Sequence, residues 1–191
     1  MSRKKLRLKF PKAITSLLLL LILGGISSQF LAQTSQGYQP LQSAKVTRIV
    51  DGDTLDINLS GCRLPLIDKP QQCRIQLACI DTPEIGQEPF FKNAKERIEE
   101  LLPLGTTVRV RDTGDSSGDR IVAEIFLDKQ SINLQMVREG NAVVYCKHLN
   151  SCAGSRNSYL NAESAAKREG LGVWNPRQPW TQSRELHPCS R

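Results

Sequence analysis

The stretch CRIQLACIDTPE, residues 73–84, joins an apolar alternating half to an acidic half. The buried positions of the alternation are Ile75, Leu77 and Cys79. A period of two is typical of a strand with one buried face, so the first half predicts a strand. In the second half, Asp81 and Glu84 bracket a Thr-Pro step. Taken alone, this acidic half is also typical of a helix start, with Thr as the cap and Pro at the first position.

The segments on either side extend this pattern into a small barrel. Further strands are predicted at residues 44–50, 54–59, 107–111 and 121–127, and a short β-like segment at 142–145. Helices are predicted at residues 89–102, 131–139 and 159–169, and the polar residues 112–119 are predicted to form an exposed loop. Five strands with about three helices predict a mainly β domain of the α+β class, built on a five-stranded Greek-key barrel of the OB-fold type.

Residues 1–32 have the layout of an export signal. Six basic residues and no acidic residue occupy the first twelve positions, and an apolar run follows at residues 13–26. This run is short for a membrane span, so we expect either a cleaved signal peptide or an N-terminal membrane tether. The protein is then secreted, periplasmic or membrane-anchored. Residues 33–43 are predicted to be a flexible leader, 44–175 the folded domain and 176–191 a C-terminal tail.

The net charge of the whole chain is a poor guide to its partners. The chain carries 26 basic and 19 acidic residues, a net charge of +7. Without the six basic residues of the N-terminal segment, 20 basic residues face 19 acidic ones, a net charge of +1. The charge is therefore no evidence for nucleic-acid binding, and any basic binding surface must be local.

The chain has six cysteines, an even number that suits an oxidising compartment and allows up to three disulfides. Cys146 and Cys152 flank a polar loop and are the simplest pair to predict. Zinc is the other interpretation of clustered cysteines. It is disfavoured because the sequence has no Cys-x-x-Cys pair and because His148 and His187 are isolated.

Acidic residues at two turns of the predicted barrel can converge. Residues 50–54, VDGDT, are explained in isolation as a hairpin turn, since Asp-Gly is a common turn pair. However, Asp53 and Asp81 leave neighbouring strands, and two carboxylates with a backbone carbonyl and waters suit Ca²⁺. Glu84 can accept a proton from water, and Arg120 can donate two hydrogen bonds to a phosphate, although a lone arginine is more often a solvated surface residue. Together these groups suit phosphodiester hydrolysis.

From about residue 45 to residue 174, the chain resembles the staphylococcal nuclease-like thermonuclease family. The resemblance rests on five motifs in the family's order and spacing: VDGDTL (50–55), IDTPE (80–84), DRIVAEIF (119–126), VREGNAVVY (137–145) and AESAAKREGLGVW (162–174).

The resemblance implies a site and a reaction. The family's calcium-binding positions match Asp53, Asp81, Thr82 through its backbone carbonyl and, behind them, Asp51. Glu84 matches the general base, and Arg120 matches one of two phosphate-binding arginines. The implied activity is Ca²⁺-dependent hydrolysis of DNA and RNA that leaves 3′-phosphate ends, and we expect a monomer.

The main departure from the family lies inside the opening stretch. The family's second arginine stands five residues before the aspartate that Asp81 matches, and here that position is Gln76. Glutamine donates neutral hydrogen bonds but brings no charge, and losing one preorganised donor costs about 10²- to 10³-fold in rate. Arg74 lies on the same face of the strand and is a substrate-binding candidate that could replace the missing charge.

A second departure is that Ser117 and Gly118 stand where the family often carries a basic residue and a tyrosine. Tyr145 is a candidate for stacking on a base, with a core position as the other interpretation. The favoured hypothesis is a slow Ca²⁺-dependent nuclease. A catalytically weakened OB-fold module that binds nucleic acid or protein, and a disulfide-stabilised structural domain with a vestigial site, remain open.

Overall fold

The computed structural model describes residues 40–178, 180 and 189. The predicted export signal or tether, most of the leader, most of the tail and His187 lie outside these residues. Within the described part of the chain, no helix is both long and apolar enough to cross a membrane.

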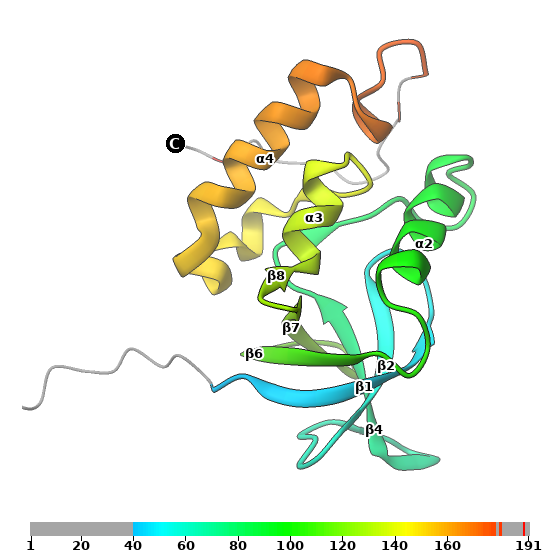
Figure 1. The fold of residues 1–191 in the computed structure, drawn as a ribbon, viewed down its shortest axis with the longest axis vertical. Coiled ribbons are helices and arrows are strands. Elements are labelled where there is room, and N and C mark those ends of the chain that lie inside the picture. The colour runs from blue at the N-terminus through cyan, green and yellow to red at the C-terminus, as the bar shows by residue number, and fades with distance from the viewer. Residues whose placement is uncertain (1–39, 179, 181–188, 190–191) are drawn as a thin grey trace, which may run out of the picture. The chain divides into compact units, whose positions relative to one another are not determined.

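Five strands form a closed barrel, which occupies the lower half of the view in Figure 1. They are β1 (Gln42–Ile49), β2 (Thr54–Leu59), β4 (Lys69–Leu77), β6 (Thr107–Ser117) and β7 (Arg120–Leu127). β1 pairs antiparallel with β2 and β6, β2 pairs antiparallel with β4, and β6 pairs antiparallel with β7. β4 runs parallel to β7, and this pairing closes the ring. The predicted five-stranded OB-type barrel is confirmed.

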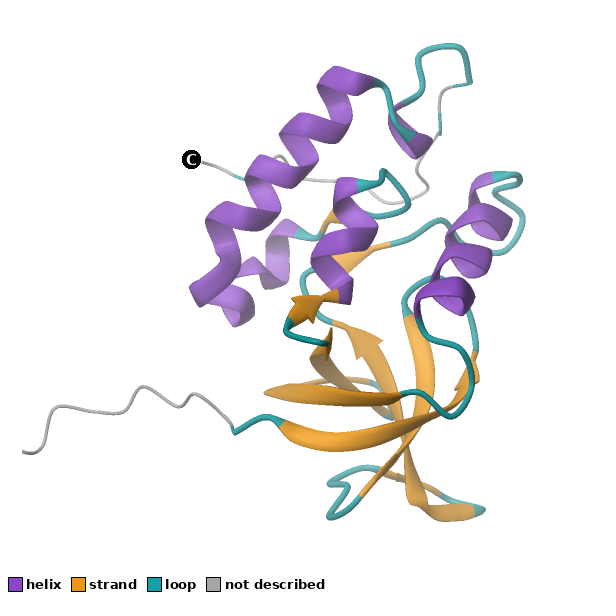
Figure 2. Cartoon of the chain, viewed as in Figure 1, coloured by secondary structure: helices purple, strands orange, loops and turns teal. Residues whose placement is uncertain are grey.

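The helices gather at one end of the barrel (Figure 2). The described residues contain three α-helices, α2 (Phe90–Leu101), α3 (Ile132–Arg138) and α4 (Arg156–Glu169), and two 3₁₀ segments, η1 (Cys146–Ser155) and η2 (Gly172–Trp174). The short strands are β3 (Pro65–Leu66), β5 (Ile80–Asp81), β8 (Gln130–Ser131) and β9 (Val143–Val144). β5 and β9 pair with each other in a second, two-stranded sheet.

Alternating apolar residues fill the barrel, as the period-two pattern predicts. Leu55, Ile57, Ile75 and Ile125 are completely buried, and burial of each such side chain contributes about 1.5–3 kcal/mol. Asn133 of α3 is also buried, and it fastens the helix to the barrel wall. Its amide donates to the carbonyl oxygens of Ala78 and Ala123 at 3.0 and 3.2 Å.

The prediction of a loop at residues 112–119 is wrong. β6 continues to Ser117, which pairs with Arg120 across a tight turn. The register shifts between Asp112 and Ser116, where Gly114 adopts a φ of 86°. This end of the hairpin is largely solvent-accessible, so its side chains need no apolar alternation to form a ladder. The extended hairpin sets the position of Arg120.

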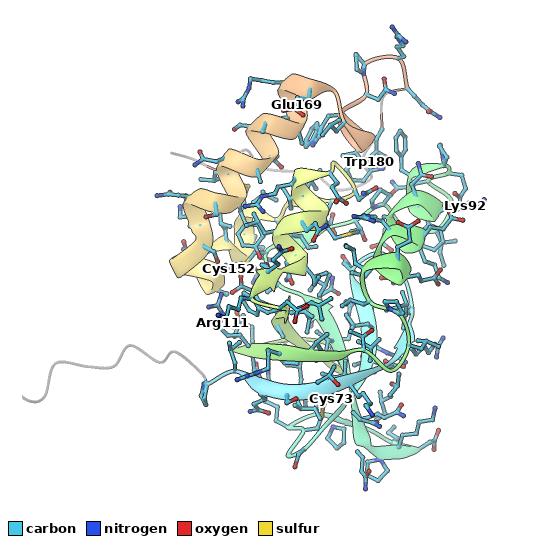
Figure 3. All side chains as sticks on the ribbon, in the orientation of Figure 1. Cys73, Lys92, Arg111, Cys152, Glu169 and Trp180 are labelled. Atoms are coloured by element: carbon cyan, nitrogen blue, oxygen red, sulfur yellow. A yellow bond between two sulfur atoms is a disulfide. The ribbon has the colours of Figure 1, made fainter. Side chains whose placement is uncertain are left out.

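The cysteines form three disulfides: Cys62–Cys73, Cys79–Cys152 and Cys146–Cys189. The predicted pairing of Cys146 with Cys152 is wrong, because the fold brings a more distant partner within bonding range of each. The Cα atoms of Cys79 and Cys152 lie 6.4 Å apart across 73 residues of sequence. Figure 3 labels Cys152, which lies in η1, so this disulfide ties η1 to the turn that follows β4.

A buried carboxylate joins α4 to the barrel. Glu124 of β7 is completely buried and forms an ion pair with Arg111 of β6, which is labelled in Figure 3. The hydroxyls of Ser155 and Tyr159 each donate to Glu124 Oε1 at 3.1 Å. Burial raises the pKa of Tyr159 to about 12, so its hydroxyl stays protonated and can donate to Glu124.

Removing this carboxylate should destabilise the fold. We expect Glu124→Ala to lower the free energy of unfolding by about 3–5 kcal/mol, because it leaves the Arg111 charge without its buried partner. Urea denaturation followed by circular dichroism measures the change. Glu99→Ala, at an exposed position of α2, is the control and should change it by less than about 0.5 kcal/mol. Equal effects of the two substitutions would contradict this account.

Candidate active site

The turn between β1 and β2 holds the first acidic pair in a fixed conformation. The backbone N–H of Asp53 donates to Asp51 Oδ1 at 3.1 Å, and Thr54 Oγ1 donates to Asp53 Oδ1 at 3.0 Å. The carbonyl oxygen of Asp53 accepts a hydrogen bond from the backbone N–H of Leu77 at 2.7 Å. The turn is therefore tied to the end of β4, and the Asp53 side chain is only 6% exposed.

Gly52 is needed in this turn for close packing. A Cβ atom at this position would lie 2.8 Å from Ala94 Cβ on α2 and 3.0 Å from Thr82 Oγ1. Gly52 is not among the glycines with positive φ, so the left-handed geometry of a common Asp-Gly turn is not the reason for it. The close approach brings the Asp53 turn against Thr82 and α2.

The second acidic group follows directly from β4. Asp81 lies in β5, opposite Val143 of β9, and is 6% exposed. Thr82 is buried as well. Glu84 is exposed to solvent, and its backbone N–H donates to Gln87 Oε1 at 2.7 Å. The loop thus presents one buried carboxylate and one that water can reach.

Asp53 is influenced by three neighbouring acidic side chains. Burial raises the pKa of Asp53 to about 8, the negative charge of Asp51 adds to the effect, and the charges of Asp81 and Glu84 add further, against the hydrogen bond from Thr54. An ionised Asp53 is therefore costly here unless a cation neutralises it. The described residues contain no cluster of three His, Cys, Asp or Glu side chains that could bind a metal by themselves.

Arg120 is connected to this acidic group through Thr54. Its Nη1 donates to Thr54 Oγ1 at 3.3 Å, while Nε and Nη2 donate to the carbonyl and hydroxyl oxygens of Ser117 at 3.2 and 2.9 Å. Gln76 lies opposite Thr54 across the β2–β4 pair and beside Val122 of β7. Sequence reasoning missed the bridging role of Thr54, although it belongs to the VDGDT motif.

A cavity of about 140 Å³ lies at the rim of the barrel. Its lining includes Gln76, Asp81, Ser117, Arg120, Tyr145 and His148. Tyr145 stacks on His148, with ring centroids 5.2 Å apart and ring planes inclined by 23°. From the sequence, His148 was interpreted as an isolated histidine. Its position three residues after Tyr145 is the one sequence feature that could have suggested the contact between the two rings. Four of the predicted site residues, Gln76, Asp81, Arg120 and Tyr145, line this cavity. The others are not among its lining residues: Asp51, Asp53, Arg74, Thr82 and Glu84.

Comparison with known proteins places the chain in a family. Residues 74–176, just over half of the chain, match the family model described as staphylococcal nuclease homologue. The chain belongs to the staphylococcal nuclease family. The resemblance seen in the sequence is thus confirmed.

Individual relatives agree with this assignment. The chain is 29% identical over 150 residues to an uncharacterized endonuclease of Haemophilus influenzae, covering 76% of each chain. It is 30% identical over 148 residues to a micrococcal nuclease of Shigella flexneri, covering 71% of this chain and 77% of the relative. It is 27% identical over 170 residues to a probable endonuclease of Arthroderma otae, covering 74% of this chain and 60% of the relative.

Arg74 is engaged away from the cavity in this member of the staphylococcal nuclease family. Its guanidinium donates to both carboxylate oxygens of the buried Asp56, at 2.8 and 3.2 Å. The two residues face each other directly across the β2–β4 pair, and the hydrogen bond with Asp56 raises the pKa of Arg74 above its ordinary value. Arg74 is not among the residues that line the cavity with Gln76, and in this conformation it is committed to Asp56.

The raised pKa of Asp53 predicts how the metal-free protein responds to pH. The folded state holds this proton more tightly than the unfolded chain does. The contribution of Asp53 to the free energy of unfolding should therefore be greatest below about pH 4. It should fall by several kcal/mol as the pH rises toward about 8. Asp53→Asn removes the ionisation and should be more stable than wild type at pH 8, with the difference vanishing near pH 4.

Urea denaturation in the presence of a chelator measures this difference across the pH range. Asp68→Asn, at an exposed position before β4, is the control and should follow the wild-type curve. Parallel curves for wild type and Asp53→Asn would show that Asp53 does not carry the pH dependence.

Proposed function

We propose that this chain is an exported, Ca²⁺-dependent nuclease that hydrolyses phosphodiester bonds of DNA and RNA and leaves 3′-phosphate ends. The observation that supports it best is the convergence of Asp53, Asp81, Glu84 and Arg120 at one rim of the barrel. The enzyme class, a hydrolase acting on phosphodiester bonds, follows from the family and the named endonuclease relatives. Gln76 lowers the rate relative to a site with two arginines.

The acidic residues fit a hard cation. The carboxylates of Asp53 and Asp81 and the backbone carbonyl of Thr82 are the oxygen donors that would hold Ca²⁺, with waters completing the set. A buried Asp53, whose ionisation is opposed by burial and by neighbouring acids, is the kind of ligand that a divalent cation stabilises. Ca²⁺ held there would supply positive charge next to a non-bridging phosphate oxygen.

Glu84 acts on the attacking water, and Arg120 acts on the phosphate. Glu84 is exposed, so it can take a proton from a water whose oxygen bonds to phosphorus. The bond between phosphorus and the 5′-oxygen breaks, leaving a 3′-phosphate and a 5′-hydroxyl that gains a proton. Arg120 donates to the phosphate. Its hydrogen-bond partners in the structure, Thr54 and Ser117, are neutral, so binding an anion breaks no ion pair.

Three disulfides support an oxidising destination for the domain, in keeping with the export signal predicted for residues 1–32. We propose that the protein acts as a monomer, secreted, periplasmic or tethered through residues 13–26. A second candidate function is a binding module without useful catalysis. The commitment of Arg74 to Asp56 favours it, because no arginine on β4 then replaces the charge that Gln76 lacks.

Cleavage of a fluorescently labelled DNA oligonucleotide tests the catalytic proposal. We expect cleavage with Ca²⁺, none with a chelator, and 3′-phosphate ends in the products. Glu84→Gln should lower kcat by about 10²- to 10⁴-fold, because it removes the proton acceptor. Glu96→Gln, at an exposed position of α2, should behave as wild type. Binding of DNA that is insensitive to chelator and without cleavage would favour the binding module instead.

A second variant tests the role of Gln76. We expect Gln76→Arg to raise kcat by up to about 10²-fold, because it adds a charged donor to the cavity that Arg120 lines. Gln72→Arg adds the same charge earlier on β4, opposite Asn58, and should leave kcat within twofold. An unchanged or lower kcat for Gln76→Arg would show that the missing arginine does not limit the rate.

A further inference from the structure

The cavity at the barrel rim is lined by a histidine whose ring nitrogens have no partner among the described residues. His148 is half-buried, and its ring stacks on Tyr145. Its ring nitrogens make no hydrogen bond or ion pair with any residue that the structure describes. A polar group held in a cavity without a protein partner is available to a ligand.

The charge in the cavity points to the kind of ligand. Arg120 is the one Arg or Lys among the described residues that line it, and Asp81 contributes a carboxylate at the acidic side. The Gln76 amide, like the His148 ring, has no hydrogen-bond partner among the described residues. An oxyanion entering the cavity would therefore meet nitrogen donors from Gln76 on β4, Arg120 on β7 and His148 in η1, in addition to the hydroxyl groups of the lining.

We propose that His148 is a catalytic residue that donates a hydrogen bond to the scissile phosphate, so that His148 and Gln76 together take the place of one arginine. This inference rests on the proposed nuclease function. The imidazole N–H donates to a non-bridging oxygen of the phosphate that Arg120 also contacts, and no proton has to be transferred. Two side chains thus donate the hydrogen bonds to phosphate that a single guanidinium can donate.

The fold holds His148 firmly enough for such a role. Its backbone N–H donates to the carbonyl oxygen of Tyr145 at 3.2 Å, and the next residue, Leu149, is completely buried. Tyr145 is itself tied to the end of β4, since its N–H donates to the carbonyl oxygen of Cys79 at 2.9 Å. The Cys79–Cys152 disulfide fixes the same segment four residues later. A donor held in this way needs little reorganisation in the transition state.

Two substitutions separate a hydrogen-bonding role from an aromatic one. His148→Phe keeps a ring that can stack on Tyr145 but removes both nitrogens, and it should lower kcat by about 10- to 10²-fold. His148→Gln loses the ring but keeps a donor, and it should recover part of this loss. Asn150→Ala, at an exposed position of η1, is the control and should match wild type. Thermal unfolding of each variant verifies that the fold is intact.

The same substitution in a Gln76→Arg background tests whether the two positions share one task. If an arginine at position 76 supplies the missing charge, His148→Phe should cost less than about threefold there, so the effects of the two substitutions are not additive. Full additivity would overturn the inference. A wild-type kcat in His148→Phe would also overturn the inference. If His148→Gln were impaired in that case, the ring would act only as a stacking surface.

A binding measurement keeps this inference separate from the proposed function. In a Glu84→Gln background, where DNA is not cut, His148→Phe should weaken binding of a single-stranded oligonucleotide by about 3- to 10-fold, because it removes one hydrogen bond to a phosphate. Unchanged binding would overturn the inference even if the wild-type protein is an active nuclease. Weakened binding in a protein that never cleaves DNA would support the phosphate contact while the nuclease function fails.

Discussion

The parallel pairing of β4 with β7 is the constraint on which the rest of the structure depends. It closes the barrel by joining the sheet that contains β2 and β4 to the β6–β7 hairpin. The pairing sets Gln76 beside Val122, and Arg120 then reaches Thr54 across the seam. Asn133 of α3 reinforces it by donating to both Ala78 and Ala123. Without closure, the acidic turns and the arginine would belong to separate hairpins and would not lie near one another.

Two buried carboxylates show how one barrel serves both stability and chemistry. Glu124 has an arginine and two hydroxyl groups as partners, so its burial is compensated and it holds α4 in place. Burial and the negative charges of three neighbouring acidic residues disfavour the ionised form of Asp53 and raise its pKa. Such a local conflict is expected at a functional site, where the stability of the surrounding fold maintains an arrangement that needs a ligand.

The donors around the cavity come from elements that the sequence does not bring together. Arg120 begins β7, Gln76 lies near the end of β4, and His148 lies in η1. The disulfide between Cys152 of η1 and Cys79, two residues after the end of β4, ties these two elements together, so oxidative folding and the geometry of the site are linked. In the proposed nuclease, a bound phosphate would therefore meet one arginine and several neutral hydrogen-bond donors in place of a pair of arginines.

The sequence by itself determined the barrel class, the three helices, the two acidic turns and the family, because periodic burial and short motifs are local properties of a chain. It failed at residues 112–119, since a polar ladder outside the core leaves no apolar signal. It also misassigned a disulfide, and it could not show that Arg74 is held by Asp56 or that His148 lies beside Tyr145. Only the tertiary structure decided these points, because cross-strand register and the closing β4–β7 seam determine which distant side chains meet.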